Sequence, residues 1–328
     1  MGTREELVRL LADGAVHSGA DLARRLNCSR TAVWKQLNRL RSMGLDIAAA
    51  RGRGYQLERP LELLDRDAIT RGLDREPRFE SLEVHGVIDS TSDRLRALPP
   101  PKPGKLRAVL AEYQTGGRGR GGRQWLSPFG SGLCLSVSGC FAVVPPSLPA
   151  LALAAGVAVN RALLEWQPRD LGLKWPNDIV AGGGKLGGLL VDVQGESGGP
   201  ITAILGVGIN IDVSERLRGE LAGNDGWPPA GLRQQGCAGP LSRNVLAANM
   251  INQLQVMMTE FARSGFVNFI DEWRHYDCLR GKQVTVTSGS QVYTGVAAGI
   301  GEDGALLLEG QGEVRKFISG EVTVRRSS

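Results

Sequence analysis

The chain has 328 residues, of which 42% are hydrophobic and 22% are charged, and this composition excludes a disordered protein and predicts two or three folded domains. We find no apolar run long enough to cross a bilayer and no secretory signal at the N-terminus, so we expect a soluble cytoplasmic protein without a membrane partner. Residues 1–59 contain eleven Lys or Arg and six Asp or Glu, whereas residues 60–328 contain 28 of each. This charge distribution predicts a polyanionic partner for the N-terminal segment alone.

Three short helices followed by a hairpin are predicted in residues 1–59. Leucines recur at helical spacing over residues 7–26, and a third helix begins at a capping residue, Ser29, and buries its positions 33, 37 and 40. Two alternating stretches, 45–49 and 55–57, flank a glycine turn, 51–54, that carries two arginines. This order of elements predicts a winged helix-turn-helix, in which the third helix enters the major groove of DNA.

Double-stranded operator DNA is the partner that we expect for this unit, because the basic wing would contact backbone phosphate. The alternative is a winged helix used for dimerisation or protein contact, which the confined charge excess disfavours. The residues expected to contact DNA are Ser29, Arg30, Thr31, Lys35, Arg51 and Arg53.

The remainder of the chain is predicted to be mixed α/β (α+β). Apolar segments at 106–111, 132–137, 186–193 and 201–211 are typical of strands of one central sheet, and residues 148–166 and 241–263 have helical patterns. Residues 223–240 resemble a long surface loop. From residue 281 onward, short alternating segments at 283–287, 292–300, 305–308, 314–318 and 322–325 predict a small β-barrel. We therefore expect domains at 1–62, 63–278 and 279–328.

A glycine- and arginine-rich segment, Glu112–Trp125, is the most unusual part of the sequence. Glycines allow backbone N–H groups to approach an anion closely, and the interleaved arginines add planar cationic donors, so the segment suits a phosphate or an adenylate. It matches neither the P-loop nor the dinucleotide-binding fingerprint. Its composition alone equally fits an RGG-like loop that binds RNA.

A second cluster, Lys174-Trp175-Pro176-Asn177-Asp178, lies between a predicted helix and an apolar strand. Its lysine suits a fixed point charge for a carboxylate or phosphate, and its amide and carboxylate could orient a ligand or Mg²⁺. An isolated cluster of this kind is more often a solvated turn with a packing tryptophan. The combination with the glycine-arginine segment favours a binding site.

By contrast, the five cysteines are scattered, without a CxxC pair or a recognisable partner base, so we expect inert thiols.

These segments, together with three others, resemble in order and spacing the ligand-binding motifs of the biotin–protein ligase family. The resemblance extends over nearly the whole chain and includes the winged helix and the C-terminal barrel of the bifunctional ligase–repressors of bacteria, often called BirA. It implies a central sheet related to class II synthetases and lipoate ligases, and an SH3-like C-terminal barrel. The motifs are residues 89–92, 112–125, 174–178, 185–190 and 206–210.

The resemblance also implies roles for individual residues. The catalytic residues would be Lys174, Arg118 and Arg120, with Lys174 holding the biotin carboxylate and the α-phosphate. Trp125, Asn177 and Asn210 would lie on the ATP side, and Asp178 would bind Mg²⁺. Ser92 departs from the family, which commonly has asparagine there. The residues implied to bind biotin are Ser90, Thr91, Ser92, Gln114, Arg118, Gly119, Arg120, Lys174 and Gly188.

The implied reaction uses biotin and ATP to form biotinyl-5'-AMP, followed by transfer of biotin to a lysine of a biotin carboxyl carrier protein. Positioning and charge neutralisation would supply the catalysis, without a nucleophilic side chain. Three alternatives stay open: a lipoate or octanoate ligase on the same scaffold, a ligand-sensing transcription regulator without ligase activity, and an RNA-binding protein. We also hypothesise a ligand-dependent homodimer that spans two half-sites on DNA.

Overall fold

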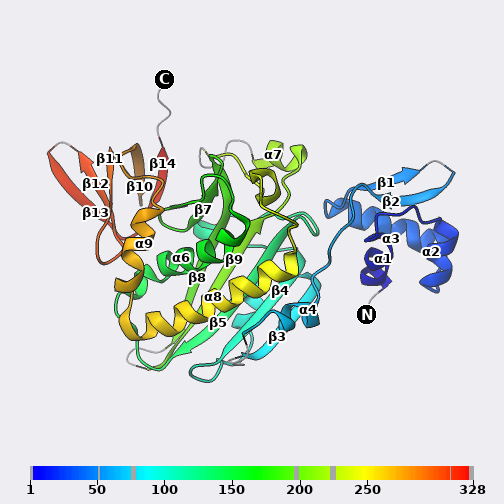
Figure 1. The fold of residues 1–328 in the computed structure, drawn as a ribbon, viewed down its shortest axis with the longest axis horizontal. Coiled ribbons are helices and arrows are strands. Elements are labelled where there is room, and N and C mark those ends of the chain that lie inside the picture. The colour runs from blue at the N-terminus through cyan, green and yellow to red at the C-terminus, as the bar shows by residue number, and fades with distance from the viewer. Residues whose placement is uncertain are drawn as a thin grey trace.

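The computed structural model describes residues 3–50, 52–74, 79–195, 199–221, 227–310 and 312–324. Figure 1 shows a small helical unit at one end of the molecule, a large sheet covered by helices in the middle, and a smaller sheet at the other end. This arrangement confirms the predicted fold class, with a winged helix, a mixed central sheet and a C-terminal antiparallel sheet.

The N-terminal unit has the predicted three helices and a hairpin. They are α1 (Thr3–Leu11), α2 (Gly19–Arg25), α3 (Arg30–Ser42) and the antiparallel strands β1 (Ile47–Ala50) and β2 (Gly54–Leu57). The Ser29 hydroxyl accepts a hydrogen bond of 3.1 Å from the Ala32 N–H and so caps α3. Gly44 has a φ of +84°, a left-handed conformation that favours glycine and ends the helix.

Seven strands form the central sheet. They are β3 (Phe79–Ile88), β4 (Leu106–Gln114), β5 (Gly132–Phe141), β6 (Gly172–Lys174), β7 (Asp178–Ala181), β8 (Gly184–Gly195) and β9 (Ile201–Asn210). Their order is β3-β4-β5-β9-β8-β7-β6, with β3 and β4 parallel and all other neighbours antiparallel. The four strands predicted from apolar runs are β4, β5, β9 and β8, which are adjacent in the sheet.

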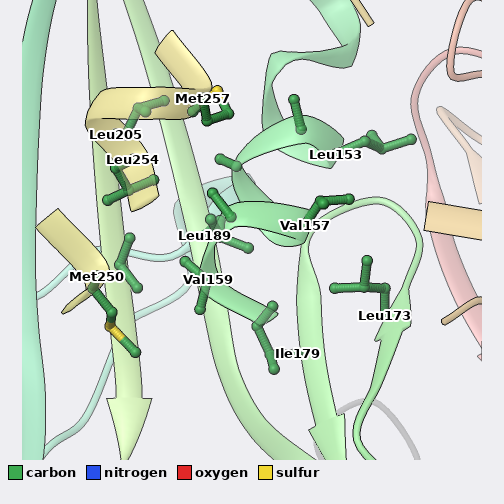
Figure 2. Packing of buried hydrophobic residues seen from close by; sticks show 14 of the residues in the cluster. Leu153, Val157, Val159, Leu173, Ile179, Leu189, Leu205, Met250, Leu254 and Met257 are labelled. Carbon is green, nitrogen blue, oxygen red and sulfur yellow. The ribbon is translucent and has the colours of Figure 1, made fainter. Parts of the chain in front are cut away.

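Helices cover both faces of this sheet. The α-helices described outside the winged helix are α4 (Arg66–Arg71), α5 (Thr91–Arg96), α6 (Leu151–Leu163), α7 (Glu215–Leu221), α8 (Arg243–Ser264) and α9 (Ile270–His275). Helices α6 and α8 bury their apolar sides on one face, where Val157 and Leu254 pack among the side chains shown in Figure 2. Helix α5 packs through Leu95 against Val109 and Ile204 on the opposite face.

Helix α6 corrects one expectation. With its flanking 3-10 turns (Leu148–Ala150 and Leu164–Trp166), it is long and apolar enough to span a membrane by length and composition, although we expected no such run. Most of it is buried inside the fold, as in a core helix of a globular domain. The predicted loop at 223–240 contains a 3-10 turn, Leu232–Gln235, and its residues 223–226 lie outside the described part of the chain.

The C-terminal unit is a five-stranded antiparallel sheet in the order β13-β12-β11-β10-β14. Its strands are β10 (Gln283–Ser288), β11 (Gln291–Ile300), β12 (Leu306–Gly310), β13 (Glu313–Phe317) and β14 (Glu321–Val324). Val284 and Leu306 on its inner side share one hydrophobic core with the central sheet. The Trp175 indole N–H also donates to the Gly304 carbonyl at 3.1 Å, which ties this sheet to the turn after β6.

Candidate functional site

A cavity of about 370 Å³ opens on the face of the central sheet that carries α5. Its volume is that of a typical small-molecule site. Its floor is formed by β5, β9 and β8, which contribute Ser136, Gly206 and Leu190 in register. The glycine-arginine segment and the N-terminus of α5 form its walls. The segments singled out in the sequence therefore converge on one cavity.

The glycine-arginine segment forms a hairpin at the end of β4. The Gly119 N–H donates to the Arg123 carbonyl at 2.7 Å, and the Trp125 N–H donates to the Gly117 carbonyl at 2.9 Å. Gly121 and Gly122 at the tip have positive φ angles of 66° and 76°, a conformation that favours glycine. The hairpin thereby presents Arg118, Gly119 and Arg120 to the cavity, as the sequence predicts.

The two arginines have different partners. Arg118 forms ion pairs with Asp93 at 2.9 Å and with Asp192 at 3.2 Å. Arg120 donates to the Gly320 carbonyl of the C-terminal sheet at 2.7 Å, and its burial lowers the pKa of its guanidinium. An arginine stays protonated at neutral pH despite such a shift. Both side chains therefore bring positive charge to the cavity wall.

Hydroxyl and amide groups meet at the inner end of the cavity. The Gln114 carbonyl oxygen accepts hydrogen bonds from the Thr91 N–H at 2.8 Å and from its hydroxyl at 3.1 Å. The Ser136 hydroxyl lies 2.7 Å from the Thr91 hydroxyl and 2.9 Å from the Ser92 hydroxyl. Ser90 caps α5 and lines the same wall. This buried network offers several donors and acceptors to a polar head group.

Trp125 lies over two glycines that pair across β8 and β9. Gly188 and Gly208 are register partners, and a Cβ at Gly208 would lie 2.4 Å from Cε2 of the indole. A Cβ at Gly188 would lie 3.6 Å from Cζ3 of the same ring. The two glycines therefore make a flat surface on which the indole packs. The buried Trp125 Nε1 has no hydrogen-bond partner in the described part of the chain.

Lys174 is not one of the residues that line the cavity. Its side chain is only 5% exposed, and its ammonium lies 3.3 Å from Oδ2 of Asp178. Oδ1 of Asp178 lies 2.8 Å from the ammonium of Lys185, and it is Lys185 that lines the cavity. Lys174 and Asp178 are register partners in β6 and β7, so their side chains lie on the same face of the sheet and form a buried pair. The lysine that faces the cavity with Arg118 and Arg120 is therefore Lys185.

Asp178 was also expected to bind Mg²⁺. Each of its carboxylate oxygens is paired with a lysine ammonium, and no group of three or more His, Cys, Asp or Glu within the described ranges could hold a metal ion. Mg²⁺ that binds together with ATP phosphates needs only one or two protein carboxylates, so the role of Asp178 toward Mg²⁺ stays a prediction. Asn177 and Asn210 line the cavity, and their amides donate to the backbone carbonyls of Leu189 and Lys185. Both side chains therefore hydrogen-bond to the backbone of β8.

Three of the residues that form the cavity had no role in the sequence-based prediction. Lys185 belongs to the predicted motif 185–190, but no role was predicted for its side chain. The alternation of Lys185 with the fully buried Leu186 could have indicated that Lys185 faces the other side of the sheet. Ser136 lies within an apolar strand, and its alternation with Leu135 and Val137 was likewise visible. Trp227, which also lines the cavity, follows a segment outside the described residues and had no sequence signal.

The residues expected to contact DNA lie on the winged helix. Arg30, Thr31 and Lys35 are exposed on α3, and Ser29 is exposed at its N-terminus. Arg53 is exposed in the turn of the wing, and Arg51 lies outside the described residues. Trp34, an aromatic side chain on the same helix that is 53% exposed, was not among the predicted DNA contacts.

None of the five cysteines forms a disulfide within the described structure. Burial raises the pKa of the Cys134 thiol to about 11 and that of the Cys278 thiol to about 12. Such thiols are protonated at neutral pH and are poor nucleophiles. The cavity chemistry therefore depends on its cations and hydrogen-bonding groups.

Comparison with known proteins agrees with this geometry. Residues 84–210 match the biotin/lipoate A/B protein ligase family, residues 3–56 match an HTH domain, and residues 280–325 match the biotin protein ligase C-terminal domain. The chain is 36% identical to the bifunctional ligase/repressor BirA of Salmonella typhimurium over 97% of its own length and 96% of that protein. The chain belongs to the BirA family. It is also 34% identical to the BirA protein of Escherichia coli, over 98% of this chain and 96% of that protein.

A solved structure shares the fold of this BirA family member over about three quarters of the chain. The biotin protein ligase of Aquifex aeolicus, in complex with biotin and ATP, superposes with a TM-score of 0.61 at 26% identity and covers 76% of this chain and 100% of that one. The segment of this chain that matches the ligase family, 84–210, contains every residue from Ser90 to Asn210 that was predicted to bind biotin or ATP. The predicted ligand residues thus fall within the segment that matches the ligase family.

Proposed function

We propose that this chain is an ATP-dependent biotin–protein ligase that also represses transcription through its winged helix. The observation that carries the proposal is the convergence of Arg118, Arg120 and Lys185 on one cavity whose inner end is a buried hydroxyl and amide network. A ligand with a polar head and an anionic tail matches this distribution of groups. The BirA proteins similar to this chain are named for both activities.

In the first step, a carboxylate oxygen of biotin would attack the α-phosphorus of ATP and displace pyrophosphate, giving biotinyl-5'-AMP. Two anions must approach each other, and three cations at the cavity would lower their repulsion and stabilise the charge of the transition state. Ser90, Thr91, Ser92 and Gln114 would bind the biotin head group. Asp178, beside Lys185, would be the residue to hold Mg²⁺, and the ion would offset the negative charge of the ATP phosphates.

In the second step, the amine of an acceptor lysine would attack the acyl carbon, release AMP and lose a proton. Closure of the hairpin over the adenylate would exclude water until that lysine arrives. Trp125, Asn177 and Asn210 would lie on the nucleotide side of the cavity. The acceptor that we propose is a biotin carboxyl carrier protein.

A transfer assay tests the ligase activity. The full chain is incubated with biotin, ATP, Mg²⁺ and a biotin carboxyl carrier domain, and the mass of the acceptor is measured. We expect the mass gain of one biotin, its loss in Lys185→Met, and its retention in Lys316→Met, an exposed lysine on β13. Replacement of biotin by lipoic or octanoic acid tests the related ligases. Absence of both pyrophosphate and acceptor product with all three acids would favour a regulator without ligase activity.

The repressor half of the proposal rests on the exposed basic residues of α3 and the wing. Arg30→Ala and Lys35→Ala would each weaken binding to a DNA duplex and reduce its dependence on salt concentration. Dimerisation would be tested by sedimentation with and without biotin and ATP, since a ligand-bound dimer could span two half-sites. A species that stays monomeric on DNA would refute the dimer.

We further propose domain boundaries at residues 62 and 278, which the family matches at 3–56, 84–210 and 280–325 support.

A further inference from the structure

Lys174 is a buried cation whose position the proposed reaction does not explain. Its side chain is 5% exposed, and it does not line the cavity. Strand β6 holds it firmly, because Leu173 exchanges backbone hydrogen bonds with Tyr276 and Cys278 at 2.7 and 3.0 Å. Burial of an ammonium is unfavourable unless a counterion compensates it. The compensating group is the carboxylate of Asp178.

Asp178 is shared between two lysines. Its Oδ2 lies 3.3 Å from the Lys174 ammonium on the buried side, and its Oδ1 lies 2.8 Å from the Lys185 ammonium on the cavity side. Asp178 itself is 8% exposed, so water screens these interactions weakly. The three side chains carry a net charge of one positive unit, and only Lys185 is in a position to meet a ligand.

The shared carboxylate has a consequence for the cavity. With Lys185 as its single partner, Asp178 would neutralise the ammonium that faces the ligand and compete with any incoming anion. Lys174 pairs with the other oxygen of Asp178. The negative charge of Asp178 is therefore still balanced by Lys174 when Lys185 turns toward an anionic ligand. We propose that Lys174 is a positioning residue, which holds Asp178 so that the Lys185 charge remains available to the biotin carboxylate. This inference rests on the proposed function.

The test compares two ligands that differ only at the tail. Biotin carries a carboxylate, whereas biotinol carries a neutral hydroxyl in its place, and calorimetry measures the affinity of the full chain for each. In Lys174→Met we expect the affinity for biotin to fall about tenfold, as for loss of one charge interaction, and the affinity for biotinol to change less than about twofold. Lys185→Met should show the same discrimination between the two ligands.

Two further measurements separate positioning from folding. Lys174→Arg keeps the charge and should recover most of the affinity for biotin, and thermal unfolding checks that each variant is folded. Equal losses for biotin and biotinol in Lys174→Met would show a distorted cavity and overturn the proposal, as would no loss for either ligand. A wild-type chain that binds neither ligand would instead contradict the proposed function.

Discussion

The backbone N–H of Phe129, which follows the glycine-arginine hairpin, donates a hydrogen bond of 2.9 Å to the carbonyl of Met43, at the end of helix α3. The Phe129 side chain is 5% exposed and belongs to the hydrophobic core of the winged helix, together with Leu37 and Leu57. Pro128 packs so closely that a Cβ at Gly44 would lie 2.6 Å from it. Three and four residues after Trp125, Pro128 and Phe129 thus anchor the segment that lines the cavity in the winged helix.

The first prediction concerns this anchor. Phe129→Ala should lower the free energy of unfolding of the winged helix by about 3–5 kcal/mol, as large-to-small changes in a core do. It should also weaken the contact between the winged helix and the hairpin. Hydrogen exchange should rise over residues 3–57 while β5 and β9 stay protected. The matched variant Phe129→Leu, which keeps most of the apolar volume, should change exchange little. Unchanged protection of residues 3–57 in Phe129→Ala would show that the anchor is dispensable.

Much of the fold was predictable because its central strands are buried on both sides. Strands β4, β5 and β9 appear in the sequence as apolar runs for that reason, whereas β8 is partly exposed from Leu190 onward. Strand β3 was missed because it is an edge strand, and most of its residues are partly exposed and carry no apolar run. Strands β6 and β7 have three and four residues, too short to show a period.

The site was predictable only as far as composition and order identify it. Arg118 and Arg120 were identified because arginines between glycines are unusual, and the structure places both at the cavity. The choice between Lys174 and Lys185 depends on the register of the β6–β7 turn and on which side of β8 faces α5. Residue identity does not carry that information, so the contact of Lys174 with the biotin carboxylate, which the resemblance implies, stays a prediction.

The second prediction concerns the flat surface under Trp125. Gly208→Ala would place a methyl group about 2.4 Å from the indole, so Trp125 must move away from β9. We expect a loss of adenylate formation of at least about tenfold, because misplacement of a binding group by an ångström is costly to catalysis. Pyrophosphate release with biotin and ATP measures it. Gly219→Ala on α7, where an added methyl meets no atom within 4 Å, is the control. Wild-type rates in Gly208→Ala would mean that the indole position is irrelevant.

The third prediction concerns a buried ion pair between α8 and β4. The Arg243 guanidinium, 2% exposed, lies 2.7 Å from Oε2 of Glu112, whose other oxygen accepts from the Leu64 N–H at 2.5 Å. Glu112→Ala should destabilise the fold by about 3–5 kcal/mol, because it leaves a buried charge without its partner. Urea unfolding measures the change. Glu215→Ala, which removes the exposed partner of Arg218, should lower the free energy of unfolding by less than about 1 kcal/mol. Similar costs for both variants would contradict this account.

The last prediction concerns Asp277, which lies between helix α9 and the C-terminal sheet. Burial raises the pKa of its carboxyl, and its Oδ2 is buried without a hydrogen-bond partner in the described structure, whereas Oδ1 accepts from the Leu279 N–H at 2.9 Å. A carboxyl whose pKa is higher in the folded than in the unfolded state lowers stability as the pH rises from about 3.9 through the folded value.

Asp277→Asn keeps the acceptor for Leu279 and removes the charge, so it should stabilise the fold by about 1 kcal/mol at pH 7. The gain should shrink as the pH falls, because the wild-type carboxyl then becomes neutral as well. Thermal unfolding of both proteins between pH 4 and pH 8 measures this difference, with the exposed Asp271→Asn as the control. A gain that is independent of pH would show that packing, rather than the buried charge, determines the effect.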